Sequence, residues 1–258
     1  MSRSVGARIL DLLFPPHCPI CGNKSGTDGC LCPSCLEKYS AEQKERCPVC
    51  GKTAGDCTCG LAGISRTFLG DKKIVALTFY HPHGSNPERV TETLVRKFKK
   101  RYDRSLTDLF ARDISGKLLL LMKASGEDPG KWVVTFPPRS TENKQKFGFD
   151  QGEYAVRSIS RYTGIPRGRT LRRTGGEEQK ELGRGERVLN SISLKLARRA
   201  DVRGKKIILF DDIITTGATV RAATDLLVDA GAECVFPVCI ARVQKEQRKY
   251  KREERSGI

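Results

Sequence analysis

The segment Ile207–Thr219 reads IILFDDIITTGAT, and its order of residue types decides the fold of this sequence. Four apolar residues, typical of a buried strand, run directly into two adjacent acids, Asp211 and Asp212. A threonine-rich loop follows and leads into an apolar periodicity that predicts a helix from Val220. A strand, a carboxylate pair and a hydroxyl-rich turn before a helix together predict a binding site.

The predicted site has the chemistry of a sugar phosphate site. Backbone N–H groups of the loop would face outward at the positive end of the helix, which forms a cradle for phosphate. The loop consists of Thr215, Thr216, Gly217, Ala218 and Thr219. Asp211 and Asp212 would emerge beyond the strand Ile207–Phe210, where open α/β sheets bind ligands, and could hold the vicinal hydroxyls of a ribose. A Walker loop and the Rossmann glycine fingerprint are both absent.

Strand and helix patterns alternate along the rest of the larger part of the chain. Strands are predicted at 74–80, 132–136, 207–210 and 234–241. Helices are predicted from Asn86 and Pro87, from the capping-box pattern Ser105-x-x-Asp108 to Met122, from Asp150 to Tyr162 before Gly164, and from Val220 to Gly231. Strands separated by helices predict an α/β fold, with a parallel sheet flanked by helices.

Nine of the eleven cysteines lie between Cys18 and Cys59, which predicts a small, separate N-terminal unit. Cysteines two residues apart point two thiolates at one ion, and two such pairs complete the tetrahedron that zinc prefers. We therefore expect two structural Zn²⁺ sites. The expected ligands are Cys18, Cys21, Cys32 and Cys35 for the first site, and Cys47, Cys50, Cys57 and Cys59 for the second.

Several points about the cysteines stay open from spacing alone. The pairs can combine sequentially, as we expect, or interleave. Cys30 is either a spare thiol or a substitute for Cys32, and His17 is more often a neighbour than a ligand. A disulfide framework is the alternative, but no export signal is visible and cytosolic thiols stay reduced.

The chain is strongly basic, with a net charge of +17, and little of this charge belongs to the cysteine-rich part. Basic clusters lie at 96–104, 167–173, 198–206 and 245–255. This distribution would attract a polyanion, either a phosphorylated small molecule or a nucleic acid, or it is a solvated basic surface. No apolar run approaches the roughly 20 residues that span a bilayer, so we expect a cytoplasmic protein without a membrane span.

The segment Ile207–Thr219 resembles the signature of the type I phosphoribosyltransferases, which bind 5-phosphoribosyl 1-pyrophosphate (PRPP). Further features resemble the ComF family of competence proteins, which join an N-terminal zinc-binding segment to such a domain. These features are PPHCPIC at 15–21, FGFDQ at 147–151, and Arg173-Thr174 followed by Gln179, Leu182, Arg187 and Asn190. The resemblance covers nearly the whole chain and is weakest at 65–128 and in the basic tail.

The resemblance implies a zinc-ribbon-like domain at 1–62, a phosphoribosyltransferase-like domain at 63–245 and a basic tail at 246–258. It implies that Asp211 and Asp212 hold the ribose hydroxyls and that the threonine-rich loop holds the 5-phosphate. The implied pyrophosphate loop consists of Pro137, Pro138, Arg139 and Ser140. The implied mobile hood spans Arg172–Arg187. Mg²⁺ is expected with PRPP.

For catalysis we expect Asp211 and Asp212 to act with arginines that neutralise the leaving pyrophosphate. The candidate arginines are Arg139, Arg173 and Arg187. Two departures from the family pattern fall on the pyrophosphate side. Phe147–Gln151 reads FGFDQ where the family has Arg-Gly-Phe-Asn-Gln, and Thr135-Phe136-Pro137 replaces Pro-Val-Pro.

The function implied is a PRPP-dependent transferase of the ComF type, linked to DNA uptake or natural transformation. The alternatives are an accessory protein that binds single-stranded DNA, together with uptake machinery such as a ComF-associated helicase, and a PRPP sensor without turnover. No residue pattern identifies the acceptor, which is a nucleobase, another amine or none. The oligomeric state is equally open.

Overall fold

A four-stranded parallel sheet with the order β1-β6-β5-β2 forms the centre of the computed structural model. The structure describes residues 16–26, 30–47, 52–53, 55, 57, 74–80, 89–100, 103–139, 150–173 and 194–243. The sheet consists of β1 (Val75–Tyr80), β2 (Trp132–Thr135), β5 (Lys206–Ile214) and β6 (Cys234–Val243). An antiparallel pair, β3 (Leu171–Arg173) and β4 (Leu194–Leu196), forms a second sheet. The predicted α/β fold with a parallel sheet is therefore confirmed.

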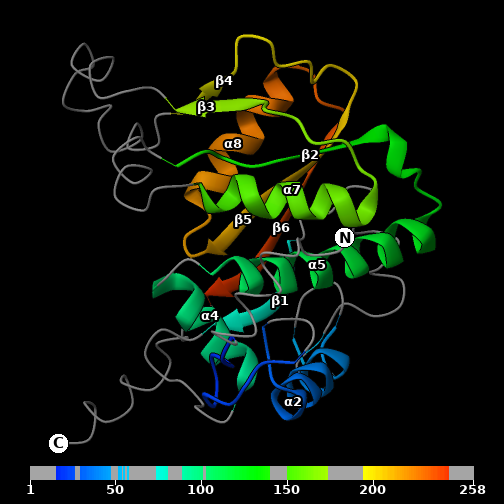
Figure 1. Ribbon diagram of the computed structural model, residues 1–258. Coiled ribbons are helices and arrows are strands. Elements are labelled where there is room, and N and C mark those ends of the chain that lie inside the picture. Colours follow the sequence, from blue (N-terminus) through cyan, green and yellow to red (C-terminus); the bar gives the residue numbers. More distant parts are fainter. Residues whose placement is uncertain are drawn as a thin grey trace, which may run out of the picture.

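Helices cover both faces of the sheet because successive side chains of a strand point to opposite sides. Along β5, Ile208 and Phe210 join the core shared with α5 and α7, whereas Ile207 and Leu209 join the core beneath α8 (Figure 1). The helices are α2 (Pro33–Lys44), α4 (Val90–Lys100), α5 (Arg104–Ser125), the 3-10 helix η1 (Pro129–Lys131), α7 (Gln151–Thr163) and α8 (Ala218–Asp229). None of the described helices is long and apolar enough to cross a bilayer.

The start and stop signals of α7 are those expected from the sequence. The Asp150 carboxylate accepts a hydrogen bond from the Gly152 N–H at 3.2 Å, which caps the first turn. Gly164 ends the helix with a φ of 75°, a conformation that glycine adopts without strain. On α4, Val90, Leu94 and Phe98 follow one another at helical spacing and are buried, whereas Asn86 and Pro87, where this helix was predicted to begin, lie outside the described residues.

The predicted capping box of α5 is wrong. The helix begins at Arg104, and its cap is Asp103, whose Oδ1 accepts from the Leu106 N–H at 3.0 Å. Asp103 precedes the helix in extended conformation, so its side chain can turn back onto the first turn as Ser105 cannot. The Asp108 carboxylate instead ties α5 to α7 by accepting hydrogen bonds from Ser158, Arg161 and Tyr162.

β5 is longer than predicted, and this changes where the acids lie. Asp211 and Asp212 were expected after the strand, but β5 continues to Ile214 because the ten-residue β6 keeps pairing with it. On the other side β2 ends at Thr135, which pairs with Leu209. Among the described residues, β5 therefore pairs with β6 alone where the two acids lie.

The helix between the cysteines, α2, was not predicted, and it packs on the larger part of the chain. The Glu42 carboxylate accepts hydrogen bonds from the N–H groups of Val90 and Thr91 at 2.6 and 3.0 Å, and so caps α4. The Tyr39 hydroxyl donates to Asp113 on α5 at 2.5 Å. Buried cysteines of this segment belong to the same core as α4, α5 and β1. The predicted domain limit at residue 62 lies outside the described residues and stays a prediction.

Candidate functional site

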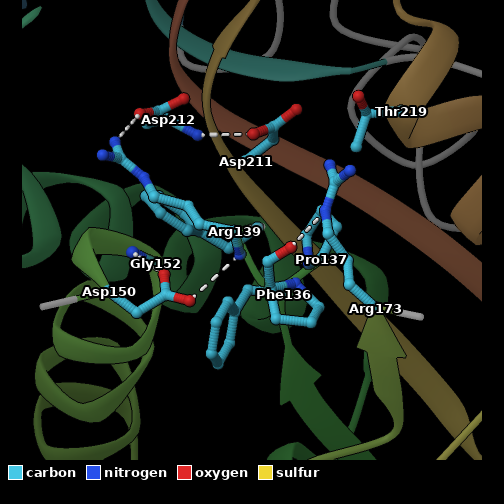
Figure 2. Close-up of a pocket in the computed structure, with 11 residues that line it drawn as sticks. Phe136, Pro137, Arg139, Asp150, Gly152, Arg173, Asp211, Asp212 and Thr219 are labelled. Carbon is cyan, nitrogen blue, oxygen red and sulfur yellow. Dashed lines mark hydrogen bonds and ion pairs between the residues drawn. The ribbon is translucent and has the colours of Figure 1, made fainter. Parts of the chain in front are cut away.

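A cavity of about 120 Å³ opens at the carboxyl ends of β2 and β5, beside the two acids (Figure 2). This is the edge at which open α/β sheets bind ligands. Side chains from β5, the segment after β2, the start of α7, β3 and the start of α8 meet there. The lining residues are Phe136, Pro137, Pro138, Arg139, Asp150, Gly152, Arg173, Phe210, Asp211, Asp212 and Thr219.

The two carboxylates differ in their surroundings. Asp211 Oδ1 accepts from the Asp212 N–H at 3.0 Å, and Asp212 Oδ1 accepts from the Ile213 N–H at 2.7 Å. Burial and the neighbouring Asp212 charge raise the pKa of Asp211 to about 7, while Arg139 and Arg173 act in the opposite direction. The site therefore holds one carboxyl that changes charge near neutral pH.

Arg139 is held at both ends. Its backbone N–H donates to Asp150 Oδ2 at 3.1 Å, and its guanidinium Nη2 donates to Gln151 Oε1 at 2.6 Å and to Asp212 Oδ2 at 3.1 Å. Asp150 uses its other oxygen to cap α7. Asp150 thus joins the segment after β2 to α7.

Arg173 approaches the cavity from β3. Its Nε donates to the carbonyl oxygen of Pro138 at 2.7 Å, and burial lowers its pKa while the charges of Asp211 and Asp150 raise it. Figure 2 places its guanidinium between Pro137 and Thr219, across the cavity from Arg139. Two arginines therefore flank the carboxylate pair.

The threonine-rich loop leads into α8 as predicted. Gly217 precedes the helix with a φ of 77°, and the Ala218 N–H donates to Thr216 Oγ1 at 3.3 Å. Thr219 lines the cavity, whereas the predicted site residues Thr215, Thr216, Gly217 and Ala218 are not among its lining residues. The positive end of a twelve-residue helix thus points toward the site, which is an arrangement that favours anions.

Most of the predicted site residues come together. Pro137, Pro138, Arg139, Arg173, Asp211, Asp212 and Thr219 all line one cavity. Ser140 and Arg187 lie outside the described residues, as does the hood beyond Arg173. The sequence assigned no role to Phe136, Gln151 or Gly152. A Cβ on Gly152 would lie 2.7 Å from the Phe136 ring, so this glycine permits the close approach of α7 to the end of β2.

Four cysteines form one cluster with the geometry of a metal site. The sulfurs of Cys18, Cys21, Cys32 and Cys35 all lie within 4.8 Å of one another. Although burial opposes ionisation, backbone N–H groups lower the pKa of Cys18 to about 6. Four convergent thiols of this kind suit a tetrahedral Zn²⁺ ion, and the sequential pairing predicted for the first site is the one found. Cys30 is buried nearby but is not part of this set.

The described ends of the two Cys-x-x-Cys turns that begin at Cys18 and Cys47 share one hydrogen-bond pattern. In each, the N–H of the first cysteine donates over 2.7 Å to the carbonyl five residues later, from Cys18 to Asn23 and from Cys47 to Lys52. A β-bridge flanks each turn, between His17 and Lys24 and between Arg46 and Thr53. Cys50 and Cys59, two expected ligands of the second site, lie outside the described residues.

Comparison with protein families agrees with both parts of the chain. Residues 9–62 match the double zinc ribbon domain, and residues 153–256 match the phosphoribosyl transferase domain. The second match includes β5, the threonine-rich loop and α8. The chain therefore combines a double zinc ribbon domain with a phosphoribosyltransferase domain.

Curated relatives match over short segments. An orotate phosphoribosyltransferase of a Nocardioides species is 51% identical over 45 residues, which are 17% of this chain and 25% of that protein. The bifunctional protein PyrR of Halalkalibacterium halodurans is 64% identical over 31 residues, which are 12% of this chain and 17% of that protein. The matched segments thus span a quarter or less of these relatives.

Two solved structures align with about half of this chain, at low sequence identity and low TM-score. The allosteric regulatory enzyme of purine biosynthesis aligns with 53% of this chain and 26% of its own, with 24% identity and a TM-score of 0.33. The glutamine PRPP amidotransferase from B. subtilis, complexed with ADP and GMP, aligns with 54% of this chain and 26% of its own, with 22% identity and a TM-score of 0.35.

Proposed function

We propose that this protein binds PRPP in the cavity beside Asp211 and Asp212 and transfers its phosphoribosyl group. One observation carries the proposal: a carboxylate pair on β5 and the N-terminal end of α8 meet in one cavity that is flanked by Arg139 and Arg173. Carboxylates suit ribose hydroxyls, a helix N-terminus suits a phosphate, and arginines suit a pyrophosphate. PRPP carries these three groups on one sugar.

In this proposal the chain's groups divide the work. Asp211 and Asp212 accept hydrogen bonds from the ribose hydroxyls, and the loop before α8 holds the 5-phosphate. Arg139 and Arg173 stabilise the charge that grows on pyrophosphate as its bond to the anomeric carbon breaks. Phe136 and the prolines after β2 exclude water from the reacting carbon, which would otherwise be hydrolysed.

The residues of the site also fit a magnesium ion. Asp211 and Asp212 supply hard carboxylate oxygens, and Mg²⁺ usually combines one or two such ligands with water and substrate phosphates. When bound there, the ion would neutralise part of the charge of pyrophosphate. The acceptor is not assigned. One relative is named for orotate, but the matched segment covers a quarter of that protein.

Release of pyrophosphate from PRPP tests the transferase. We expect pyrophosphate release to require Mg²⁺ and one acceptor from a panel of nucleobases and amines. In Asp212→Ala the rate of release should fall at least tenfold, since a charge-assisted hydrogen bond contributes about 1.5–3 kcal/mol. Saturable PRPP binding without release under any acceptor would instead identify a sensor without turnover.

We also propose two structural zinc ions rather than one. The described ends of the second Cys-x-x-Cys turn repeat the backbone hydrogen bond and the β-bridge of the first, which supports a ligand role for Cys47. With Cys50, Cys57 and Cys59 it would complete a second tetrahedral site. The double zinc ribbon match over residues 9–62 supports this assignment.

The ComF family, and with it a role in DNA uptake, is our proposal for the wider context. It rests on the order of the zinc segment and the transferase domain together with the motifs PPHCPIC and FGFDQ. Four exposed basic residues lie in β4 and in the segment between β4 and β5, and they favour nucleic acid as a second partner. They are Lys195, Arg198, Arg199 and Arg203. Binding of single-stranded DNA that weakens steeply with salt would support this role. A lack of binding at low salt would remove it.

A further inference from the structure

Arg139 occupies the carboxylate that the proposed function assigns to the ribose. Its guanidinium Nη2 lies 3.1 Å from Asp212 Oδ2, and the other oxygen of Asp212 accepts from the Ile213 N–H at 2.7 Å. Each oxygen of this acid therefore already accepts one hydrogen bond. A ribose hydroxyl that bonds to Asp212 Oδ2 has to share this oxygen with the guanidinium or displace it.

Further hydrogen bonds hold Arg139 in this position against Asp212, which we call the closed position. Gln151 is 4% exposed, and its Oε1 accepts from the same Nη2 at 2.6 Å. Asp150 fixes the backbone N–H of Arg139 at 3.1 Å. The side chain of Arg139 is 26% exposed and that of Asp212 is 31% exposed, so the pair is partly shielded from water.

The size of the cavity is consistent with a closed site. Its volume of about 120 Å³ is below the roughly 300–1,000 Å³ of cavities that bury small molecules. Figure 2 shows the Arg139 side chain lying along one side of this cavity and reaching Asp212. Movement of this one side chain would both enlarge the cavity and release the carboxylate.

We propose that Arg139 is a selectivity gate that favours a pyrophosphorylated ribose over ribose 5-phosphate. The inference rests on the proposed PRPP binding. Either sugar competes with the guanidinium for Asp212, but only PRPP brings a pyrophosphate that gives the guanidinium a new anionic partner. Ribose 5-phosphate therefore weakens the ion pair without replacing it, while PRPP offers the arginine another anion.

The gate predicts opposite effects of one substitution on two sugars. In Arg139→Ala, ribose 5-phosphate should bind about two- to tenfold more tightly, because the partly exposed ion pair no longer competes for Asp212. PRPP should bind at least about tenfold more weakly, because its pyrophosphate loses a cation. The measurement is calorimetric titration of the full chain with each sugar at constant Mg²⁺ and salt. Arg169→Ala is the matched control, since it also removes an arginine paired with an acid, Glu153, but at an exposed position.

A second variant tests the gate without changing charge. Gln151→Leu removes the amide that steadies the closed guanidinium, and it should tighten ribose 5-phosphate about twofold while PRPP is not weakened. If Arg139→Ala weakens both sugars to the same extent, or leaves ribose 5-phosphate unchanged, Arg139 is no gate. If the wild-type chain binds no PRPP, the proposed function fails first and the gate fails with it.

Discussion

The carboxyl of Asp211 links the charge of the site to the stability of the chain. Its pKa is about 7 in the folded protein, against about 3.9 for an ordinary aspartate. The folded state therefore binds this proton more tightly than the unfolded state does. Ionising Asp211 costs stability as the pH rises from about 4 to 7, and above pH 7 the cost is complete.

Replacing Asp211 with asparagine should remove this cost. We expect Asp211→Asn to be more stable than the wild type at pH 8, by up to about 4 kcal/mol, and the difference to vanish near pH 4. Urea unfolding at several pH values measures it. Asp225→Asn, which removes an exposed carboxylate from α8, is the control. A difference between Asp211→Asn and wild type that stays constant with pH would contradict the raised pKa.

At the level of single residues, the sequence predicted the acids and the loop but not their contacts. Asp211, Asp212 and Thr215–Thr219 follow one another, so their order alone indicates a sugar phosphate site. Arg139 and Asp212 are 73 residues apart, and spacing says nothing about a bond between them. Gln151 accepts a hydrogen bond from the same guanidinium, and the sequence did not predict this contact either.

Among the elements, α2 carries an interaction that the cysteine pattern did not reveal. The closely spaced cysteines and turn residues of the N-terminal segment predict metal-binding turns. Its apolar residues are too few to indicate a helix. Yet Glu42 on α2 caps α4 through three hydrogen bonds, which include the Thr91 hydroxyl at 2.7 Å. The helices of the larger part were easier to predict, because Asp150 and Gly164 mark the ends of α7 in the sequence itself.

Glu42→Ala should destabilise the chain through α4. The loss of a capping carboxylate costs about 0.5–2 kcal/mol, and here two backbone N–H groups would lose their acceptor. Chemical unfolding followed by circular dichroism measures the change. Glu37→Ala removes an exposed acid from the same helix and should have almost no effect. Equal effects of the two variants would mean that the cap contributes nothing.

At the scale of the whole molecule, the cysteine cluster and the sheet share one core. Cys18, Cys32 and Cys35 are buried in the same cluster as Phe98 of α4 and Phe110 of α5. Cysteine spacing alone predicted a separate unit, because spacing shows local geometry and not what the unit packs against. The structure thus makes the zinc segment a support for the fold that holds the proposed site.

Removing zinc should therefore weaken the sheet as well. A chelator is expected to release about two zinc ions and to lower the melting temperature by roughly 2–4 °C for each 1 kcal/mol lost. Trp132 on β2 is the only tryptophan and is 1% exposed, so its fluorescence reports on the sheet. Release of one zinc ion would exclude the second site. A Trp132 melting curve that chelation leaves unchanged would show that the two parts fold independently.

Titration of wild type and Asp212→Ala with PRPP and Mg²⁺, and separately with inorganic sulfate, tests the central claim most directly. If Asp212 holds the ribose and the start of α8 holds the phosphate, the variant should bind PRPP at least tenfold more weakly, since a charge-assisted hydrogen bond contributes about 1.5–3 kcal/mol. Its sulfate binding should be nearly unchanged, because backbone N–H groups make that cradle. Equal loss of PRPP and sulfate binding would show that Asp212 supports the loop and does not bind the sugar.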